Sequence, residues 1–205
     1  SADFVIPFNR LMLLMEVEEG DYRVDSLRYV MLSGDWIDIN IPKRIYDLSA
    51  STHVLAMGGA TEASIWSNYI DIQGAVSSDW ISIPYGKPLP RQSYRVVNES
   101  GIDCPDYVVG ELWIGGVGVA KGYLGDEELT RDKFVTDAYG RWYRTGDLGR
   151  FWKDDTIEFL GRSDRQVKLR GHRIELGEIE NAIDCLPEVE KSYIDISKEE
   201  GTQAL

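Results

Sequence analysis

Alternating polar and apolar residues predict a short β-hairpin near the C-terminal end of the chain. Residues 166–170 read QVKLR, residues 173–175 read RIE, and Gly171 between them supplies a turn. A strand at residues 189–196 and a polar tail at residues 197–203 follow later. Between hairpin and strand, apolar residues at spacings of three and four predict a one-sided helix that Pro187 ends: Leu176, Ile179, Ile183 and Leu186.

The rest of the chain divides into two parts by pattern. Residues 1–70 combine an apolar, helix-like segment at 11–17 with strand-like runs at 27–32 and 53–57, which predicts an α/β region. Residues 72–160 are richer in Gly, Pro, Val, Trp and Tyr, and their strand candidates lie at 94–98, 110–114 and 156–160. This second part is predicted to be mostly β and barrel-like.

Composition narrows the class of protein. The chain is 43% hydrophobic and 28% charged, and neither a membrane-spanning apolar run nor a signal peptide is visible, so we expect a soluble, cytoplasmic protein without a membrane partner. The net charge of −13 disfavours binding to nucleic acids and anionic lipids. Cys104 and Cys185 are far apart, and His53 and His172 have no partners at ligand spacing, so we expect neither a disulfide framework nor a zinc site.

Five ordered motifs carry a family resemblance. They read SGDW (33–36), GGATEAS (58–64), GELWIGGVGVAKGYL (110–124), YRTGDLGR (143–150) and GRSDRQVKLRGHRIELGEIE (161–180). Together they resemble the amino-acid adenylation domains of nonribosomal peptide synthetases, from near residue 5 to near residue 200. The resemblance implies the end of an α/β sheet lobe (1–71), a distorted β-barrel subdomain (72–163) and the start of a small α+β C-terminal lobe (164–205).

The resemblance also implies a reaction. Such domains join an amino acid to ATP with Mg²⁺, release pyrophosphate, and pass the aminoacyl group to the phosphopantetheine thiol of a peptidyl carrier protein domain. The family's phosphate loop and late catalytic lysine are absent from the 205 residues. We therefore expect a truncated or interrupted adenylation domain that needs the remaining parts of the same domain and is inactive alone. A noncatalytic interaction module is an alternative, as is an acyl- or aryl-CoA ligase segment, although such ligases usually carry proline at the position of Gly177.

Matching motif positions implies nucleotide contacts. Thr61 corresponds to a phosphate-contacting threonine and Glu62 to a Mg²⁺-binding glutamate, although a lone Thr-Glu pair is ordinarily a surface feature. Asp147 would accept hydrogen bonds from both ribose hydroxyls, and the alternative is a turn residue that caps its own backbone. Arg162 matches an arginine that, in the family, lies near the nucleotide at the junction of the lobes. An aromatic residue usually precedes the threonine by three positions, where this chain has Gly58, so the adenine contacts are assigned to Gly58, Gly59, Ala60 and Phe159.

Further roles follow from the last motif. Asp164 matches the hinge at which the C-terminal lobe rotates between adenylation and thioester formation. The hairpin that would then face the thiol contributes Lys168, Arg170, Gly171 and Arg173. The glycines of residues 115–122 are not interpreted as a phosphate loop, because no Gly-Lys-Ser/Thr ending follows, and Lys121 is expected to be solvated.

Five residues match the positions that line the family's amino-acid pocket and therefore bear on the choice of substrate: Met31, Ser33, Met57, Ile65 and Trp66. This apolar pocket with one small hydroxyl resembles cysteine-activating domains of siderophore synthetases, so cysteine is the favoured substrate, and threonine or serine is next. Phe4 departs from the asparagine that such domains tend to carry. The alternative is that the five residues are ordinary core residues.

Overall fold

The computed structural model describes residues 27–33, 36–163, 166–169, 172–186, 189–195, 197–199 and 202–204. The chain forms two compact units, Ser1–Leu160 and Gly161–Leu205, and each is considered separately. The predicted helix at 11–17 and the departure at Phe4 lie outside the described residues. Within the described part of the chain, no helix is both long and apolar enough to cross a membrane.

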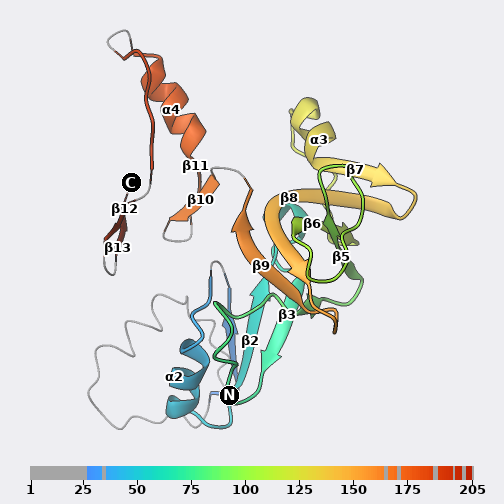
Figure 1. Ribbon diagram of the computed structural model, residues 1–205, viewed down its shortest axis with the longest axis vertical. Coiled ribbons are helices and arrows are strands. Elements are labelled where there is room, and N and C mark those ends of the chain that lie inside the picture. Colours follow the sequence, from blue (N-terminus) through green and yellow to red (C-terminus); the bar gives the residue numbers. More distant parts are fainter. Residues whose placement is uncertain are drawn as a thin grey trace. The chain divides into compact units, whose positions relative to one another are not determined.

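The first unit begins with a four-stranded sheet of order β1-β2-β3-β4, of which Figure 1 labels β2 and β3. β1 (Tyr29–Leu32) pairs in parallel with β2 (His53–Gly58), whereas β3 (Asn68–Ile72) and β4 (Lys87–Pro88) add in antiparallel fashion. The strands predicted at 27–32 and 53–57 are thus confirmed within a residue or two at each end.

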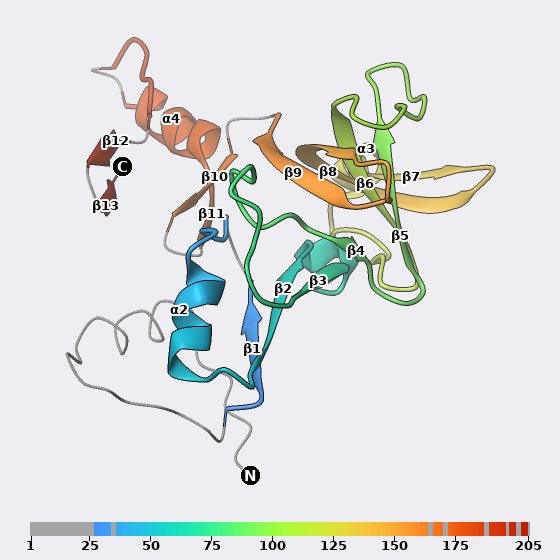
Figure 2. The ribbon, with the colours of Figure 1, turned by 60° about the horizontal axis from the view of Figure 1, so that its bottom comes forward.

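A helix that the sequence reading did not identify, α2 (Ile41–Leu48), connects the two parallel strands. Pro42 is tolerated in its first turn, where backbone amides have no partner within the helix. Figure 2 shows α2 beside this sheet. Its buried Ile41 and Ile45 share a core with residues from one face of the sheet: Val30, Leu32, Val54, Ala56 and Ile72.

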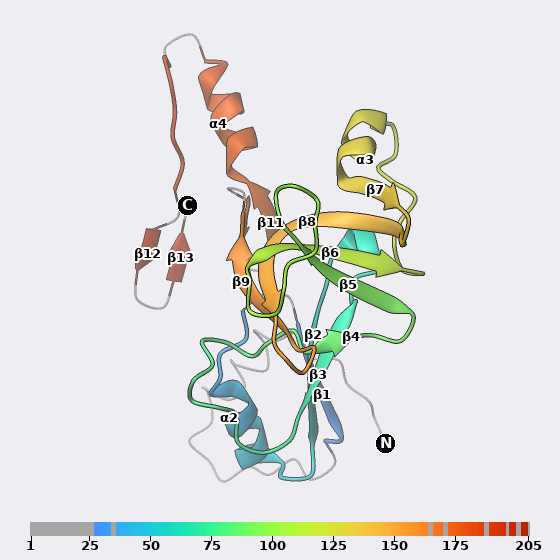
Figure 3. The same cartoon turned by 45° about the vertical axis from the view of Figure 1, so that its right-hand side comes forward.

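The β-rich part is a second, curled sheet of order β5-β6-β8-β7, with β9 also paired to β8. Figure 3 shows β8 curving through it, with α3 next to β7. The strands are β5 (Gln92–Val97), β6 (Gly110–Gly116), β7 (Phe134–Asp137), β8 (Gly140–Phe151) and β9 (Ile157–Arg162), and α3 is Glu127–Lys133. This half-barrel confirms the barrel-like prediction. The predicted strands 94–98, 110–114 and 156–160 fall on β5, β6 and β9, while β7 and β8 were missed.

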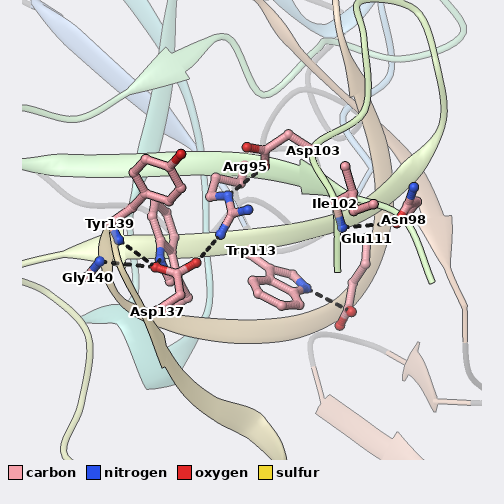
Figure 4. A network of polar contacts seen from close by, with 10 residues as sticks. Arg95, Asn98, Ile102, Asp103, Glu111, Trp113, Asp137, Tyr139 and Gly140 are labelled. Carbon is pink, nitrogen blue, oxygen red and sulfur yellow. Dashed lines mark hydrogen bonds and ion pairs between the residues drawn. The ribbon is translucent and has the colours of Figure 1, made fainter. Parts of the chain in front are cut away.

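Alternating inward residues of the curled sheet make its core, which includes Tyr94, Val96, Leu112, Ile114, Phe134, Tyr143 and Ile157. A polar cluster centred on Arg95, the Arg95 cluster, lies at the same sheet (Figure 4). The Arg95 guanidinium pairs with Asp103 (Nε to Oδ1, 2.6 Å) and with Asp137, and it lies 5.2 Å from the ring centre of Trp142. Burial lowers the pKa of Arg95, but the two carboxylates outweigh this effect and raise it.

Asp137 closes the turn between β7 and β8. Its Oδ1 accepts hydrogen bonds from the amides of Tyr139 (2.8 Å) and Gly140 (3.1 Å) and from the Trp142 indole (3.0 Å). Desolvation raises the pKa of Asp137, but these hydrogen bonds and the Arg95 charge hold it below the usual range. The Arg95 cluster therefore ties β5 to the β7–β8 turn by paired charges.

The second unit starts with the predicted hairpin, which is confirmed. β10 (Gln166–Leu169) pairs antiparallel with β11 (His172–Glu175), in a register that sets Gln166 opposite Glu175. α4 (Leu176–Asp184) follows as predicted but ends earlier than Pro187 suggested, and Leu186 is exposed beyond it.

The strand predicted at 189–196 is wrong, since residues 189–195 form no strand. Their amides bind carboxylates of α4 instead of a neighbouring strand: Ser192 donates to Asp184 (2.6 Å) and Ile194 to Glu180 (2.8 Å). The segment predicted as a polar tail instead contains a small antiparallel pair, β12 (Ser197–Glu199) and β13 (Thr202–Ala204).

Candidate functional site

The GGATEAS motif forms a tight loop, residues 58–67, between β2 and β3. The Ser67 amide donates to the Gly58 carbonyl oxygen (2.8 Å) and closes the loop. Inside it, Thr61–Ala63 form one 3-10 turn, and Ser64 and Ile65 follow with φ of 63° and 72°. A β-branched residue rarely adopts this left-handed conformation, so the loop stores backbone strain. Such strain is common where a protein binds a ligand.

Gly59 is required by the loop's own backbone. Its φ is +146°, and a Cβ there would lie 2.7 Å from the Ile65 carbonyl oxygen and 2.8 Å from the Ser67 amide nitrogen. No side chain fits against backbone atoms at that distance. The second glycine of the motif therefore lets the two ends of the loop approach each other.

Glu62 is held by the GELWIGGVGVAKGYL segment. Its Oε1 accepts a hydrogen bond from the Tyr123 hydroxyl (2.8 Å), and its carbonyl oxygen accepts one from the Ala120 amide (2.8 Å). Burial, with the neighbouring Tyr143 and Glu62, raises the pKa of the Tyr123 hydroxyl, so that it remains a donor. Thr61 beside it is exposed. A hydroxyl and a single fixed carboxylate suit a phosphate and a Mg²⁺ ion that keeps waters and phosphate oxygens as its other ligands.

Asp147 lies at an irregularity inside β8 and not in a turn. Between Glu111 and Trp113 of β6 the register slips, because their partners on β8 are Leu148 and Arg144. The extra residues form a β-bulge, a feature that redirects side chains. Thr145 fixes the bulge: its hydroxyl donates to the Leu112 carbonyl oxygen (2.6 Å) and accepts from the Asp147 amide (2.9 Å). The Asp147 amide is thus bound by Thr145, whereas the ribose role of its carboxylate stays a prediction.

Tyr94 of β5 binds the end of the loop. Its buried hydroxyl bonds with the Ser67 hydroxyl (2.6 Å) and accepts from the Asn68 side-chain amide (2.7 Å). Burial is the main cause that raises the pKa of Tyr94, and the negative charge of Asp147 adds to it. The loop 58–67 is therefore bound to the same curled sheet whose strand β8 carries Asp147.

Tyr94 itself was missed as a site residue. The sequence indicated only a strand there, and the one available signal was a hydroxyl at an inward position of that strand.

An aromatic group lies beside the same loop. Phe159 stacks on Tyr85 with ring centres 5.0 Å apart and planes inclined by 5°, and Trp36 meets Phe159 edge-on at 5.4 Å. Tyr85 also packs against Gly58, where a Cβ would lie 2.9 Å from its Cε1. The structure brings Phe159 and Gly58 together, as the resemblance implied, but through Tyr85, which the sequence reading missed.

The predicted substrate pocket is partly assembled. Ser33 and Trp66, distant in sequence, are joined by a hydrogen bond from the indole Nε1 to the hydroxyl (2.9 Å). Met31 and Met57 alternate with the buried residues of β1 and β2, so they belong to the sheet face opposite α2. Ile65 is 65% exposed and Met31 45%. The alternative that these are ordinary core residues is therefore wrong for both.

The remaining predicted residues belong to the second unit. Arg162 ends β9 and is half-buried. Lys168 and Arg173 lie opposite each other in the register of β10 and β11. Asp164, Arg170 and Gly171 lie outside the described residues, so their roles stay predictions. Lys121 in the first unit is exposed as expected.

Known proteins resemble this chain over most of its length. A family model for AMP-binding enzymes matches residues 7–124. The anguibactin system regulator of Vibrio anguillarum is 56% identical over 82% of the chain, and the pyochelin synthetase PchE of Pseudomonas aeruginosa is 56% identical over 84%. The chain spans only 16% and 12% of the length of these relatives.

The similarity extends to solved structures. NpsA-ThdA, an artificially fused adenylation-PCP di-domain nonribosomal peptide synthetase from Klebsiella oxytoca, superimposes with a TM-score of 0.75 at 30% identity. The match covers 95% of this chain and 36% of that one. The fold described above is therefore that of part of an adenylation domain.

Proposed function

The chain belongs to the family of AMP-binding enzymes, and on this basis we propose that it carries the nucleotide-contacting part of an adenylation domain that activates an amino acid. The observation that carries the proposal is that a distant element fixes each motif: Tyr123 orients the Glu62 carboxylate beside the exposed Thr61, and Thr145 fixes the bulge that carries Asp147. These two motifs, far apart in sequence, would supply the groups for phosphate and the acceptors for ribose.

The proposed reaction uses these groups as follows. An amino-acid carboxylate oxygen attacks the α-phosphorus of ATP, the bond from that phosphorus to the bridging oxygen breaks, and pyrophosphate leaves with the electron pair. Asp147 accepts hydrogen bonds from the ribose hydroxyls and positions the nucleotide. Thr61 binds a phosphate oxygen, and Glu62, oriented by Tyr123, would hold a Mg²⁺ ion, which would offset the developing charge. By the resemblance, Arg162 would contribute a permanent positive charge.

The second proposed step transfers the aminoacyl group to the phosphopantetheine thiol of a carrier protein, with AMP as leaving group. Support comes from the similar solved structure NpsA-ThdA, which is described as an artificially fused adenylation-PCP di-domain. The hairpin of β10 and β11, with Lys168, Arg170, Gly171 and Arg173, would face the carrier after rotation at Asp164.

Cysteine is the proposed substrate. Support comes from the Ser33 hydroxyl, fixed by Trp66, and from the resemblance, which assigns the apolar Met31, Met57 and Ile65 to the same pocket. An apolar pocket with one hydroxyl suits a small, weakly polar thiol. Serine and threonine are the competing substrates, because their hydroxyls would bind the same group.

The test is amino-acid-dependent ATP–pyrophosphate exchange by the intact parent protein with each of the twenty amino acids. We expect exchange to depend on cysteine, and loading of a carrier protein in preference to free coenzyme A. Absence of exchange with any amino acid, or preferential loading of coenzyme A, would contradict the proposal.

The ribose role of Asp147 has its own test. Asp147→Ala removes a charged acceptor worth about 2–3 kcal/mol, so we expect the KM for ATP to rise by roughly 30- to 150-fold. The KM for the amino acid and the circular dichroism spectrum should stay near those of the unmodified protein. Asp147→Asn, which keeps one acceptor oxygen, should have a smaller effect. An unchanged KM for ATP in Asp147→Ala would remove the ribose role.

A further inference from the structure

Tyr85 occupies the space that the missing side chain of Gly58 leaves. A Cβ on Gly58 would lie 2.9 Å from Cε1 and 3.1 Å from Cδ1 of the Tyr85 ring, and 3.0 Å from the Asn68 side-chain oxygen. Carbon atoms that are not bonded do not approach so closely, so a side chain at position 58 would displace the ring. The two positions therefore share one space, and here residue 85 fills it.

The backbone around Tyr85 fixes this placement. The next residue, Gly86, has a φ of +76° and forms an isolated antiparallel bridge with Ile157, in which each amide donates to the other's carbonyl oxygen (3.3 and 2.7 Å). Phe159 follows two residues later on β9 and stacks flat on Tyr85 (5.0 Å, 5°). A main-chain bridge thus holds the two rings together beside the first residue of the loop 58–67.

We infer that Tyr85 is the residue that sets nucleobase affinity in this chain, because its ring and that of Phe159 form the aromatic surface against which the adenine of ATP packs. This inference rests on the proposed function. A purine stacks on aromatic rings through its flat π-system. The surface adjoins the loop that carries Thr61 and Glu62, so a base held there leaves its phosphates near these residues. Trp36, edge-on to Phe159, extends the surface.

The first test measures AMP binding by the intact parent protein with isothermal titration calorimetry, which needs no catalysis. We expect Tyr85→Ala to raise the Kd for AMP and the KM for ATP by roughly 10- to 100-fold, while the KM for the amino acid changes little. Tyr85→Phe keeps the ring and should stay within about twofold. Tyr85→Leu keeps much of the volume without the ring and should resemble Tyr85→Ala, so it decides the question if Tyr85→Ala does not fold.

The second test uses the shared space. Gly58→Phe alone should displace the Tyr85 ring and weaken AMP binding, whereas Gly58→Phe combined with Tyr85→Ala should bind AMP more tightly than either single variant. Strictly additive losses would overturn the claim that the two positions share one space. Tyr139→Ala, an exposed tyrosine of the β7–β8 turn, is the matched control and should bind AMP normally.

Failure of this inference is distinguishable from failure of the proposed function. If the unmodified protein binds AMP and exchanges pyrophosphate but Tyr85→Ala and Tyr85→Leu bind AMP equally well, only the role of Tyr85 is overturned. If the unmodified protein neither binds AMP nor supports exchange, the proposed function is overturned and this inference with it.

Discussion

The Arg95 cluster and the loop 58–67 are both polar regions of the first unit, but their atoms are arranged in opposite ways. In the Arg95 cluster the guanidinium meets two carboxylates and three aromatic rings, and the carboxylate of Asp137 closes a turn. In the loop, two consecutive residues have left-handed backbone, and a glycine is pressed against main-chain atoms. Paired charges stabilise the Arg95 cluster. The loop instead keeps a strained backbone that lowers the free energy of unfolding, which is common in binding sites.

This comparison predicts that a change in the loop damages nucleotide use most. Gly59→Ala places a Cβ against the Ile65 and Ser67 backbones, so the loop must move. A displacement of about 1 Å at a reacting site costs on the order of 100-fold in rate, and we expect pyrophosphate exchange by the intact protein to fall by about that factor. Gly140→Ala is the matched control, since Gly140 also has positive φ (+138°) but no atom within 4 Å of its Cβ position. Equal losses in both variants would contradict the special role of the loop.

The second prediction concerns the Arg95 cluster. Arg95→Ala leaves Asp103 and Asp137 without their counter-charge and uncovers three rings, so we expect this domain to lose about 2 kcal/mol of unfolding free energy. Urea unfolding followed by tryptophan fluorescence measures the loss. The KM for ATP should stay unchanged, and a raised KM at undiminished stability would show that the two regions are not independent.

The smallest expected effect is the pH dependence of the stability of the Asp137 turn in the Arg95 cluster. Because the folded-state pKa of Asp137 lies below its usual value, the carboxylate stabilises the turn fully above the ordinary range near pH 4, and this contribution is lost as pH falls through the folded-state pKa. Asp137→Asn should therefore reduce the protection of the Tyr139 and Gly140 amides in hydrogen exchange at pH 6, relative to the unmodified protein. The difference should shrink below pH 4. A difference that is constant with pH would show that the charge is not its cause.

The sequence predicted those helices and strands whose pattern of apolar and polar residues is regular over their whole length. The hairpin of β10 and β11 was predictable because its alternation spans both strands and Gly171 lies between them. The eight-residue α2 was missed because only Ile41 and Ile45, four residues apart, mark its buried face, and two such positions make a weak periodicity. The strand expected at 189–196 failed because carboxylates of Asp184 and Glu180, not a neighbouring strand, bind its amides.

Residues of the candidate site could be predicted where they belong to a contiguous motif. They could not be predicted where their position in the site depends on contacts made by the folded chain. Thr61, Glu62 and Asp147 could be chosen because their motifs are contiguous. Tyr94 and Tyr85 could not, because their roles depend on contacts across many residues: Tyr94 with Ser67, and Tyr85 with Gly58 and Phe159. No periodicity in a single sequence reports such pairs.

The bulge that carries Asp147 lies within β8, a strand paired with three others, β6, β7 and β9. Such a strand opens only when the hydrogen bonds to its neighbours break together, which makes openings rare. The loop 58–67 is not part of a strand ladder and is held by single bonds, such as those from the Ala120 amide and the Tyr123 hydroxyl to Glu62. If a nucleotide binds as proposed, we expect β8 to keep its place and the loop to make the adjustments that accompany binding and release.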